Sequence, residues 1–217
     1  VPANYFAVLY IVTYFVSPYI NLVMNRLSRE ELNGFFILVI VLFSAWPTAV
    51  DVLRRLTGKE WMGLNTIGMY GGQYGYTAVN FILLYITGAY LRLTKQRRAK
   101  IHTPLLVPAW LGTVLLLTVW ALLDRDTAWE YCNFLVIAEA VLLFLLFEGI
   151  RIPENKIINH LARASFAVYL VHAFFLPYIR IQHFVQGPVL KLAAHIALSS
   201  CGIYLLCWVI YSLYDLL

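Results

Sequence analysis

Apolar residues come in seven long runs along the chain, separated by short clusters of polar residues. These runs cover about residues 4–24, 33–50, 74–92, 104–123, 131–148, 160–180 and 191–214. Runs of roughly 18 to 22 residues have the length that a helix needs to cross ~30 Å of hydrocarbon at ~1.5 Å per residue. Strand-like alternation is absent, and backbone groups inside lipid must bond internally. The pattern therefore predicts an all-α polytopic membrane bundle of about seven transmembrane helices.

Composition strengthens this prediction. Hydrophobic residues make up 62% of the chain and charged residues only 12%, whereas a soluble domain carries roughly 25% charged residues. A water-soluble fold is thereby excluded, and residues 1–217 are interpreted as a single transmembrane domain with the lipid bilayer as its partner. The net charge of +5 does not indicate nucleic acid, because the basic residues lie between the apolar runs. Cys132, Cys201 and Cys207 lack metal-site or disulfide spacing, so no metal is expected.

The distribution of Lys and Arg predicts the orientation, since cytoplasmic loops carry more of them. The strongest basic cluster, residues 92–100, is placed in the cytoplasm. Counting alternate sides from there, the cytoplasmic set is Arg26, Arg29, Arg92, Lys95, Arg97, Arg98, Lys100, Arg151, Lys156 and Arg163. The smaller outer set is Arg54, Arg55, Lys59, Arg125, Arg180 and Lys191. In the plasma membrane, the N-terminus is then outside and the C-terminus cytoplasmic, and the longest connection, residues 51–73, is outside.

The start of the chain resembles a cut within a longer protein. Val1-Pro2-Ala3 contains no initiator Met, no basic segment and no cleavage site of a signal peptide. With an outside N-terminus, an odd number of spans is expected upstream, and these missing helices would be partners of the present ones.

The sixth run carries a polar stripe. Ser165, Tyr169 and His172 are spaced i, i+4 and i+7, so at ~100° per residue they lie within ~40° of one helix face. His172 is predicted near the middle of the membrane, where an ionisable group is by default a functional candidate. Two interpretations stay open: a place in the reaction site, or a neutral His bonded to a neighbouring helix. Pro177 predicts a kink one turn beyond His172.

Two further polar positions interrupt apolar runs. Glu139 is the only carboxylate deep within a run, where a charge costs on the order of 2.5 to 3.5 kcal/mol. It is expected to be protonated or paired with a group such as His172, which fits both proton handling and structural pairing. Asn80 and Thr87 are seven residues apart on one face, and interhelical hydrogen bonding is their expected use.

The outer loops are rich in aromatic residues, and the main cytoplasmic loop is basic. Trp46, Trp61 and Trp129 fit an interface belt, although some of these rings suit stacking on a sugar. The sequence Arg97-Arg98-Ala99-Lys100 is a topology determinant that also suits cofactor phosphates.

Three segments together resemble the acyltransferase 3 family. They run from Tyr5-Phe6-Ala7-Val8-Leu9-Tyr10 to Ser17-Pro18-Tyr19-Ile20-Asn21, from Asn80-Phe81 to Tyr90-Leu91-Arg92, and from Ser165-Phe166-Ala167-Val168 to Tyr169-Leu170-Val171-His172. Their order and spacing match throughout the chain. The resemblance implies bacterial membrane enzymes of about ten helices that use cytoplasmic acyl-CoA, here acetyl-CoA, to O-acylate acceptors such as cell-envelope polysaccharide. About three upstream helices would then be missing.

The family's principal motif, an Arg and a His separated by ten residues, has no match here, because no His in the sequence has an Arg eleven positions before it. The resemblance thus implies a catalytic His upstream of Val1, an inactive fragment, and His172 as a second polar group of the site. It further implies Asn80, Glu139, Ser165 and Tyr169 as acceptor-side groups and Arg97, Arg98 and Lys100 as donor contacts. The rival interpretation is a permease or flippase subunit, which also fits midplane Glu139 and His172.

Overall fold

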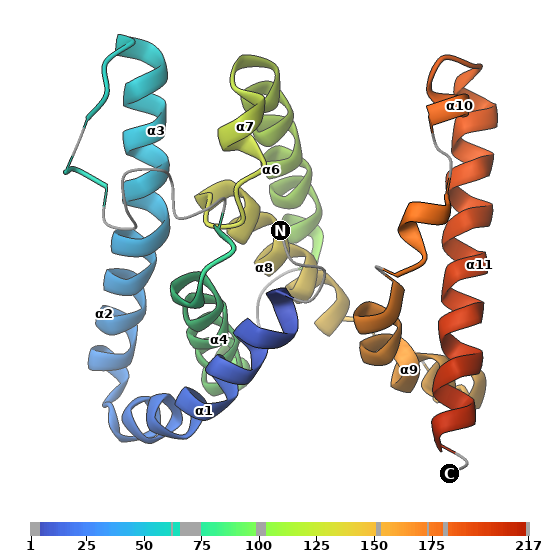
Figure 1. The fold of residues 1–217 in the computed structure, drawn as a ribbon. Helices are drawn as coiled ribbons and strands as arrows, with labels where there is room; N and C mark the ends of the chain where they lie inside the picture. The colour runs from blue at the N-terminus through green and yellow to red at the C-terminus, as the bar shows by residue number, and fades with distance from the viewer. Residues whose placement is uncertain are drawn as a thin grey trace. The chain divides into compact units, whose positions relative to one another are not determined.

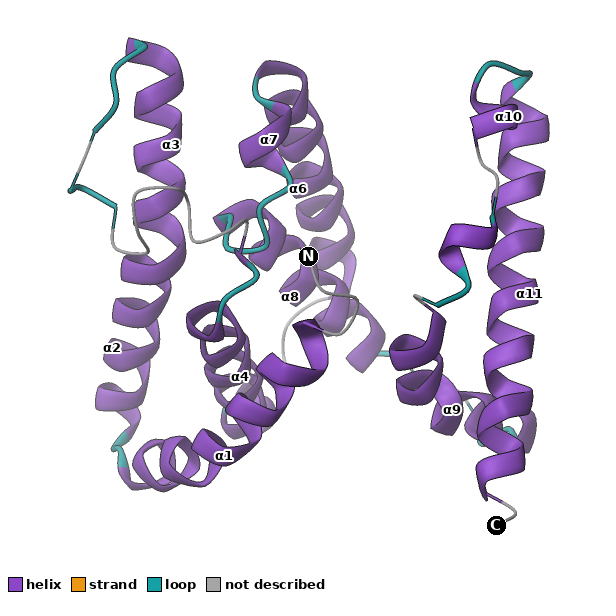
Figure 2. Cartoon of the chain, viewed as in Figure 1, coloured by secondary structure: helices purple, strands orange, loops and turns teal. Residues whose placement is uncertain are grey.

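The computed structural model describes residues 5–61, 63–65, 75–98, 103–150, 153–172, 174–179 and 182–215. Figure 2 shows helices and loops, with no strand in the described ranges. The all-α prediction is therefore confirmed. The chain forms two compact units. The larger unit is residues 8–151, and the smaller unit is residues 152–217 together with residues 1–7.

The larger unit contains most of the helices (Figure 1). In chain order they are α1 (Tyr5–Arg26), α2 (Arg29–Ile40), η1 (Val41–Ala45), α3 (Trp46–Thr57), α4 (Ala78–Leu93), α5 (Lys95–Arg98), α6 (Thr103–Leu123), α7 (Arg125–Ala128) and α8 (Phe134–Glu148). The α2, η1 and α3 segments form one continuous helix, because η1 is a single π-helical turn that widens the helix without breaking it. Ser28 begins this helix with a capping box to Glu31.

The core of the larger unit lies where α1, α2, α4 and α8 meet. Its buried residues are Met24, Leu32, Val39, Leu83, Ile86, Ala89 and Ile137. Interhelical polar contacts border it: the Asn21 amide donates to the Tyr85 hydroxyl at 2.6 Å, and the Tyr90 hydroxyl donates to Asn33 at 3.0 Å. Among the residues that the structure describes, Asn80 and Thr87 make no interhelical side-chain bond. Their side chains instead donate to the carbonyls of Gly75 and Leu83, within their own segment.

The smaller unit is built around one long helix, α11 (Val189–Asp215), against which α9 (Lys156–His172) packs. The Tyr204 hydroxyl donates to the Leu161 carbonyl at 2.7 Å and joins the two helices. Two short elements connect them, η3 (Leu176–Tyr178) and α10 (Gln182–Val185). The predicted kink at Pro177 is a full break, because α9 ends at His172 and the chain continues in turns.

Four helices in the described ranges are long and apolar enough to cross a membrane: Tyr5–Arg26, Arg29–Thr57, Pro104–Leu123 and Val189–Tyr214. Their apolar side chains face outward, as lipid-facing residues do; Leu122 on α6, for instance, is 83% exposed. The run at 74–92 corresponds to the shorter α4, and the run at 131–148 to the 15-residue α8. The total of seven spans stays a prediction. The connection predicted at 51–73 begins later than expected, since α3 continues to Thr57, and α4 begins at Ala78.

Candidate functional site

A polar junction lies at one end of the larger unit, in the segment that joins α6 to α8. Asp124 caps α7 by accepting the Thr127 amide N–H at 3.4 Å. Asn133 caps α8 by accepting the Leu135 amide at 2.9 Å, and its own amide group donates to the Thr127 carbonyl at 3.1 Å. Asp and Asn favour such positions because their short side chains satisfy the free N–H groups of a helix start. These caps fold residues 124–133, called here the junction segment, into a compact turn.

The π-helical turn η1 holds the junction segment from one side. Ser44, fully buried, donates its hydroxyl to the Cys132 carbonyl at 2.9 Å. One helical turn later, the Thr48 hydroxyl accepts the amide N–H of Phe134 at 2.9 Å, the first residue of α8. The Cys132 carbonyl of the segment and the Phe134 amide just after it are thus bonded by side chains more than eighty positions earlier in the chain. A π-turn within a helix is often found at functional sites.

Gly75 and α4 hold the segment from another side. Gly75 has φ of +84°, and a Cβ there would lie 2.7 Å from Tyr131 Cβ and 2.8 Å from Cys132 N, so only glycine fits. Asn80, 2% exposed, donates to the Gly75 carbonyl at 3.1 Å, and its buried Oδ1 has no donor among the described residues. Tyr76 packs edge-on against Tyr131, with ring centroids 5.1 Å apart.

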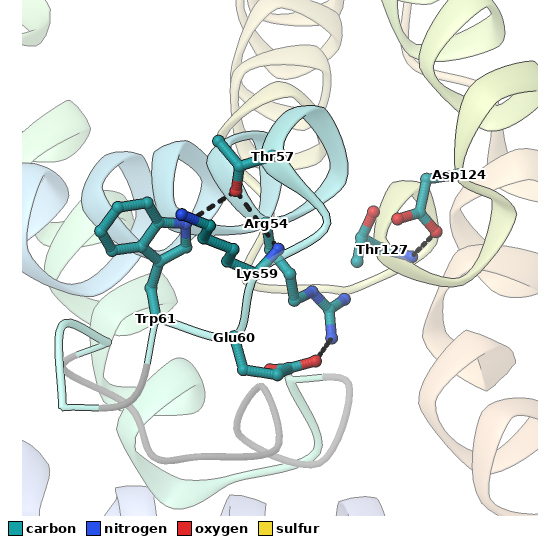
Figure 3. A network of polar contacts seen from close by, with 7 residues as sticks. All are labelled: Arg54, Thr57, Lys59, Glu60, Trp61, Asp124 and Thr127. Atoms are coloured by element: carbon teal, nitrogen blue, oxygen red, sulfur yellow. Dashed lines mark hydrogen bonds and ion pairs between the residues drawn. The ribbon is translucent and has the colours of Figure 1, made fainter.

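Glu130 lies inside the junction segment with only 7% of its surface exposed. Its carboxylate accepts one hydrogen bond in the described structure, from the Cys132 thiol at 3.7 Å. Burial, and then the charge of the Asp51 carboxylate, raise the pKa of Glu130 to about 7. Arg54 opposes this effect, but its guanidinium also pairs with Glu60 at 4.0 Å. Figure 3 shows this ion pair and the Asp124 cap of Thr127.

An open pocket of about 460 Å³ lies beside the junction segment and is lined by Tyr76, Arg125, Asp126 and Trp129. Trp129 is 70% exposed. The pocket thus combines aromatic rings with one cationic and one anionic side chain. It follows the C-terminal end of α6, whereas the basic helix α5 precedes the N-terminal end of α6. The two sites therefore belong to opposite ends of a helix ~30 Å long.

The structure distributes the sequence-predicted residues over both units. Asn80 lies at the junction described above, whereas Glu139 is half-buried on α8 and makes no hydrogen bond or ion pair in the described parts. Ser165, Tyr169 and His172 lie on α9 in the smaller unit. His172 contacts the Val168 and Tyr169 carbonyls of its own last turn through Nδ1. If His172 had a purely structural role, it was expected to bond to a neighbouring helix. No such bond occurs among the described residues.

Tyr169 and Ser165 are both exposed on α9. The Tyr169 ring contacts Phe6, which belongs to the same unit, with centroids 4.3 Å apart. Of the basic positions, Arg97 and Arg98 lie in α5, but their side chains and Lys100 are outside the described residues. Lys95, on the same helix, pairs with Glu148 at 3.4 Å.

Sequence reasoning missed Glu130, Ser44 and Thr48. The cap pattern of Asp124 and Asn133 marks two helix starts and so signals a tight connection between them. No signal in the sequence indicates that Glu130 is buried there, because a charged residue between apolar runs is expected in solvent.

Four described helices are long and apolar enough to cross a membrane and carry many exposed apolar side chains, which indicates a helical integral membrane protein. The family whose model is described as an acyltransferase domain, acyltransferase 3, matches residues 2–212. The chain belongs to this family and is a membrane acyltransferase. No curated protein and no solved structure matched it.

Proposed function

We propose that the protein transfers an acyl group, here acetyl, from acyl-CoA to a hydroxyl of a cell-envelope saccharide, as an O-acyltransferase of the bacterial plasma membrane. The acceptor hydroxyl oxygen attacks the thioester carbonyl carbon, the carbon–sulfur bond breaks, and the hydroxyl proton passes through a base to the CoA thiolate. The pocket beside Trp129 is the observation that carries the saccharide part of this proposal.

The pocket has the side chains that sugar recognition needs. The apolar faces of a sugar ring pack on exposed aromatic side chains such as Trp129, whereas hydroxyl groups exchange hydrogen bonds with charged groups such as Arg125 and Asp126. Because the pocket follows the end of α6 opposite the basic helix α5, a cytoplasmic α5 places the pocket on the outer side. The N-terminus is then outside and the C-terminus cytoplasmic.

The donor is assigned to the cytoplasmic end. Arg97, Arg98 and Lys100 supply cationic groups that suit the phosphates of CoA. On the acceptor side, Asn80 belongs to the junction next to the pocket, and Glu139, Ser165 and Tyr169 are proposed as further acceptor-side groups.

The base is proposed to lie outside these 217 residues, because no His in the sequence has an Arg eleven positions before it. His172 is proposed as a second polar group of the site. Residues 1–217 alone are therefore expected to transfer no acetyl group from acetyl-CoA. Transfer by the purified 217-residue chain at the rate of the full-length protein would overturn this assignment.

The test uses the full-length protein, radiolabelled acetyl-CoA and envelope saccharide. We expect label in the saccharide fraction that mild alkali releases, as an O-ester requires. Trp129→Ala should raise the KM for saccharide about tenfold, equivalent to ~1.4 kcal/mol, without changing the KM for acetyl-CoA. Trp61→Ala is the matched control, because Trp61 is an exposed tryptophan bonded to Thr57 and does not line the pocket. Equal effects of both variants, or alkali-stable label, would contradict the proposal.

A further inference from the structure

Glu130 stands in the sequence between two aromatic residues that are connected to the pocket. Trp129, the preceding residue, lines the pocket directly. Tyr131, the following residue, packs edge-on against Tyr76, which lines it as well. Between them the Glu130 side chain is buried and bonded to the Cys132 thiol. Any displacement of Glu130 therefore moves side chains that are connected to the pocket.

The rest of the junction segment has little freedom to adjust. Ser44 binds the Cys132 carbonyl, and Asn133 binds the Thr127 carbonyl. Gly75 approaches the backbone of the segment so closely that no Cβ fits between them. A charge on Glu130 therefore cannot reach solvent unless these contacts break.

The charged and titratable groups that act on Glu130 do not compensate a negative charge. Asp51 and Arg54 belong to α3, Asp124 precedes α7, and the Cys132 thiol lies in the segment itself. Two carboxylates thus disfavour a negative charge on Glu130, and only one guanidinium, which is also paired with Glu60, favours it. Burial and the Asp51 charge accordingly raise the pKa of Glu130 to about 7.

We propose that Glu130 is a positioning residue of the acceptor pocket: while uncharged it holds Trp129 in the pocket lining and Tyr131 against Tyr76, and its ionisation releases the junction segment and weakens acceptor binding. The inference rests on the proposed function only where it assigns the pocket to the acceptor. The release of the segment is independent of any activity.

The first test follows the release through the Cys132 thiol, which is 2% exposed in the closed segment. The full-length protein in detergent is treated with a maleimide at pH 6 and pH 8, and labelling of Cys132 and of an added cysteine-containing reference peptide is followed by mass spectrometry. Both thiols react faster at higher pH, so the ratio of their rates isolates the opening. The pKa of Glu130 is about 7 in the closed segment and 4.5 in the open one. The ratio of the two labelling rates should therefore rise about tenfold between pH 6 and pH 8.

Two variants make the result specific. Glu130→Gln keeps the shape and the thiol acceptor but cannot ionise, so the ratio should be the same at pH 6 and pH 8. Asp51→Asn removes the facing carboxylate, lowers the pKa of Glu130 and should reduce the rise, which keeps the proposal testable if the Gln variant fails to fold. A flat ratio in the wild type, or an undiminished rise in either variant, would overturn the proposal.

The second test measures acceptor binding. In the wild type the KM for saccharide should rise between pH 6 and pH 8, whereas in Glu130→Gln this KM should be independent of pH. The pH profile of kcat should be the same in the variant as in the wild type. A purely structural Glu130 would lower the amount of folded enzyme without altering the KM profile, and that result would refute the positioning role. If no saccharide is acylated at all, the proposed function fails while the labelling result stands by itself.

Discussion

Replacing Glu130 by Gln should stabilise the protein, and more so at high pH. Because the folded chain holds the pKa of Glu130 at about 7, above its ordinary 4.5, the folded state binds the proton more tightly than the unfolded state. The free energy of unfolding therefore falls as the pH rises from 4.5 to 7, and the loss is complete above 7.

The size of the effect follows from the pKa difference. About 1.4 kcal/mol for each pH unit gives on the order of 3 kcal/mol at pH 8, but only about 1 kcal/mol at pH 5, because pH 5 lies just half a unit above the pKa of the unfolded state. Gln avoids this cost, since it carries no charge and its Oε1 still accepts the Cys132 thiol. The stabilisation by Glu130→Gln should thus be about three times larger at pH 8 than at pH 5.

Unfolding in mixed micelles of mild detergent and dodecyl sulfate, followed by tryptophan fluorescence, measures this difference at both pH values. Glu154→Gln is the control, because Glu154 is exposed and its replacement should change the free energy of unfolding by less than about 0.5 kcal/mol. If Glu130→Gln destabilised the protein equally at both pH values, the carboxyl would be a favourable partner in its folded surroundings. The argument from burial would then be wrong.

Three other substitutions test the framework of the larger unit. Gly75→Ala should destabilise the protein by about 3 kcal/mol or more, because the new Cβ overlaps with the junction segment. Gly58 has φ of +65° but lies in open space, so Gly58→Ala should cost only about 1 kcal/mol. Equal losses in the two variants would refute the close approach of Gly75 to the segment. Ser44→Ala leaves a buried carbonyl unbonded and should cost roughly 1 to 3 kcal/mol in the same assay. Tyr85→Phe removes the acceptor of the Asn21 amide and should cost about 0.6 kcal/mol; a loss above 2 kcal/mol would show that this bond organises the bundle.

The apolar pattern predicts helices well where length alone decides the structure. The run at 104–123 becomes α6 with nearly the same bounds, because an unbroken apolar stretch has no alternative in lipid. The apolar pattern fails to predict a helix where charged and apolar residues alternate along it. Asp51, Arg54 and Arg55 suggested a loop, yet α3 continues until Gly58, whose left-handed conformation and bond to the Arg54 carbonyl end the helix.

The candidate site is predictable only in part, for a physical reason. Asn80 stands out in the sequence because it interrupts an apolar run, and the structure places it at the junction. Glu130 does not stand out, since its burial is created by Ser44, Gly75 and the turn between α7 and α8, which meet only in the folded chain. Long-range contacts of this kind leave no periodic signal around the residue that they enclose.

The two ends of α6 differ in chemistry, as the proposed transfer across the membrane requires. Around α5 the cationic side chain of Lys95 is mostly exposed and bonded to Glu148, whereas at the junction the carboxyl of Glu130 is buried. Phosphates are attracted by the first end and repelled by an ionised second end, so donor and acceptor would enter from opposite sides. Under the proposed function, the reacting atoms must approach within ~3.5 Å of each other, so the thioester and the hydroxyl would have to meet within the bundle. A neutral Glu130 would then favour acylation by keeping the acceptor pocket closed around its sugar.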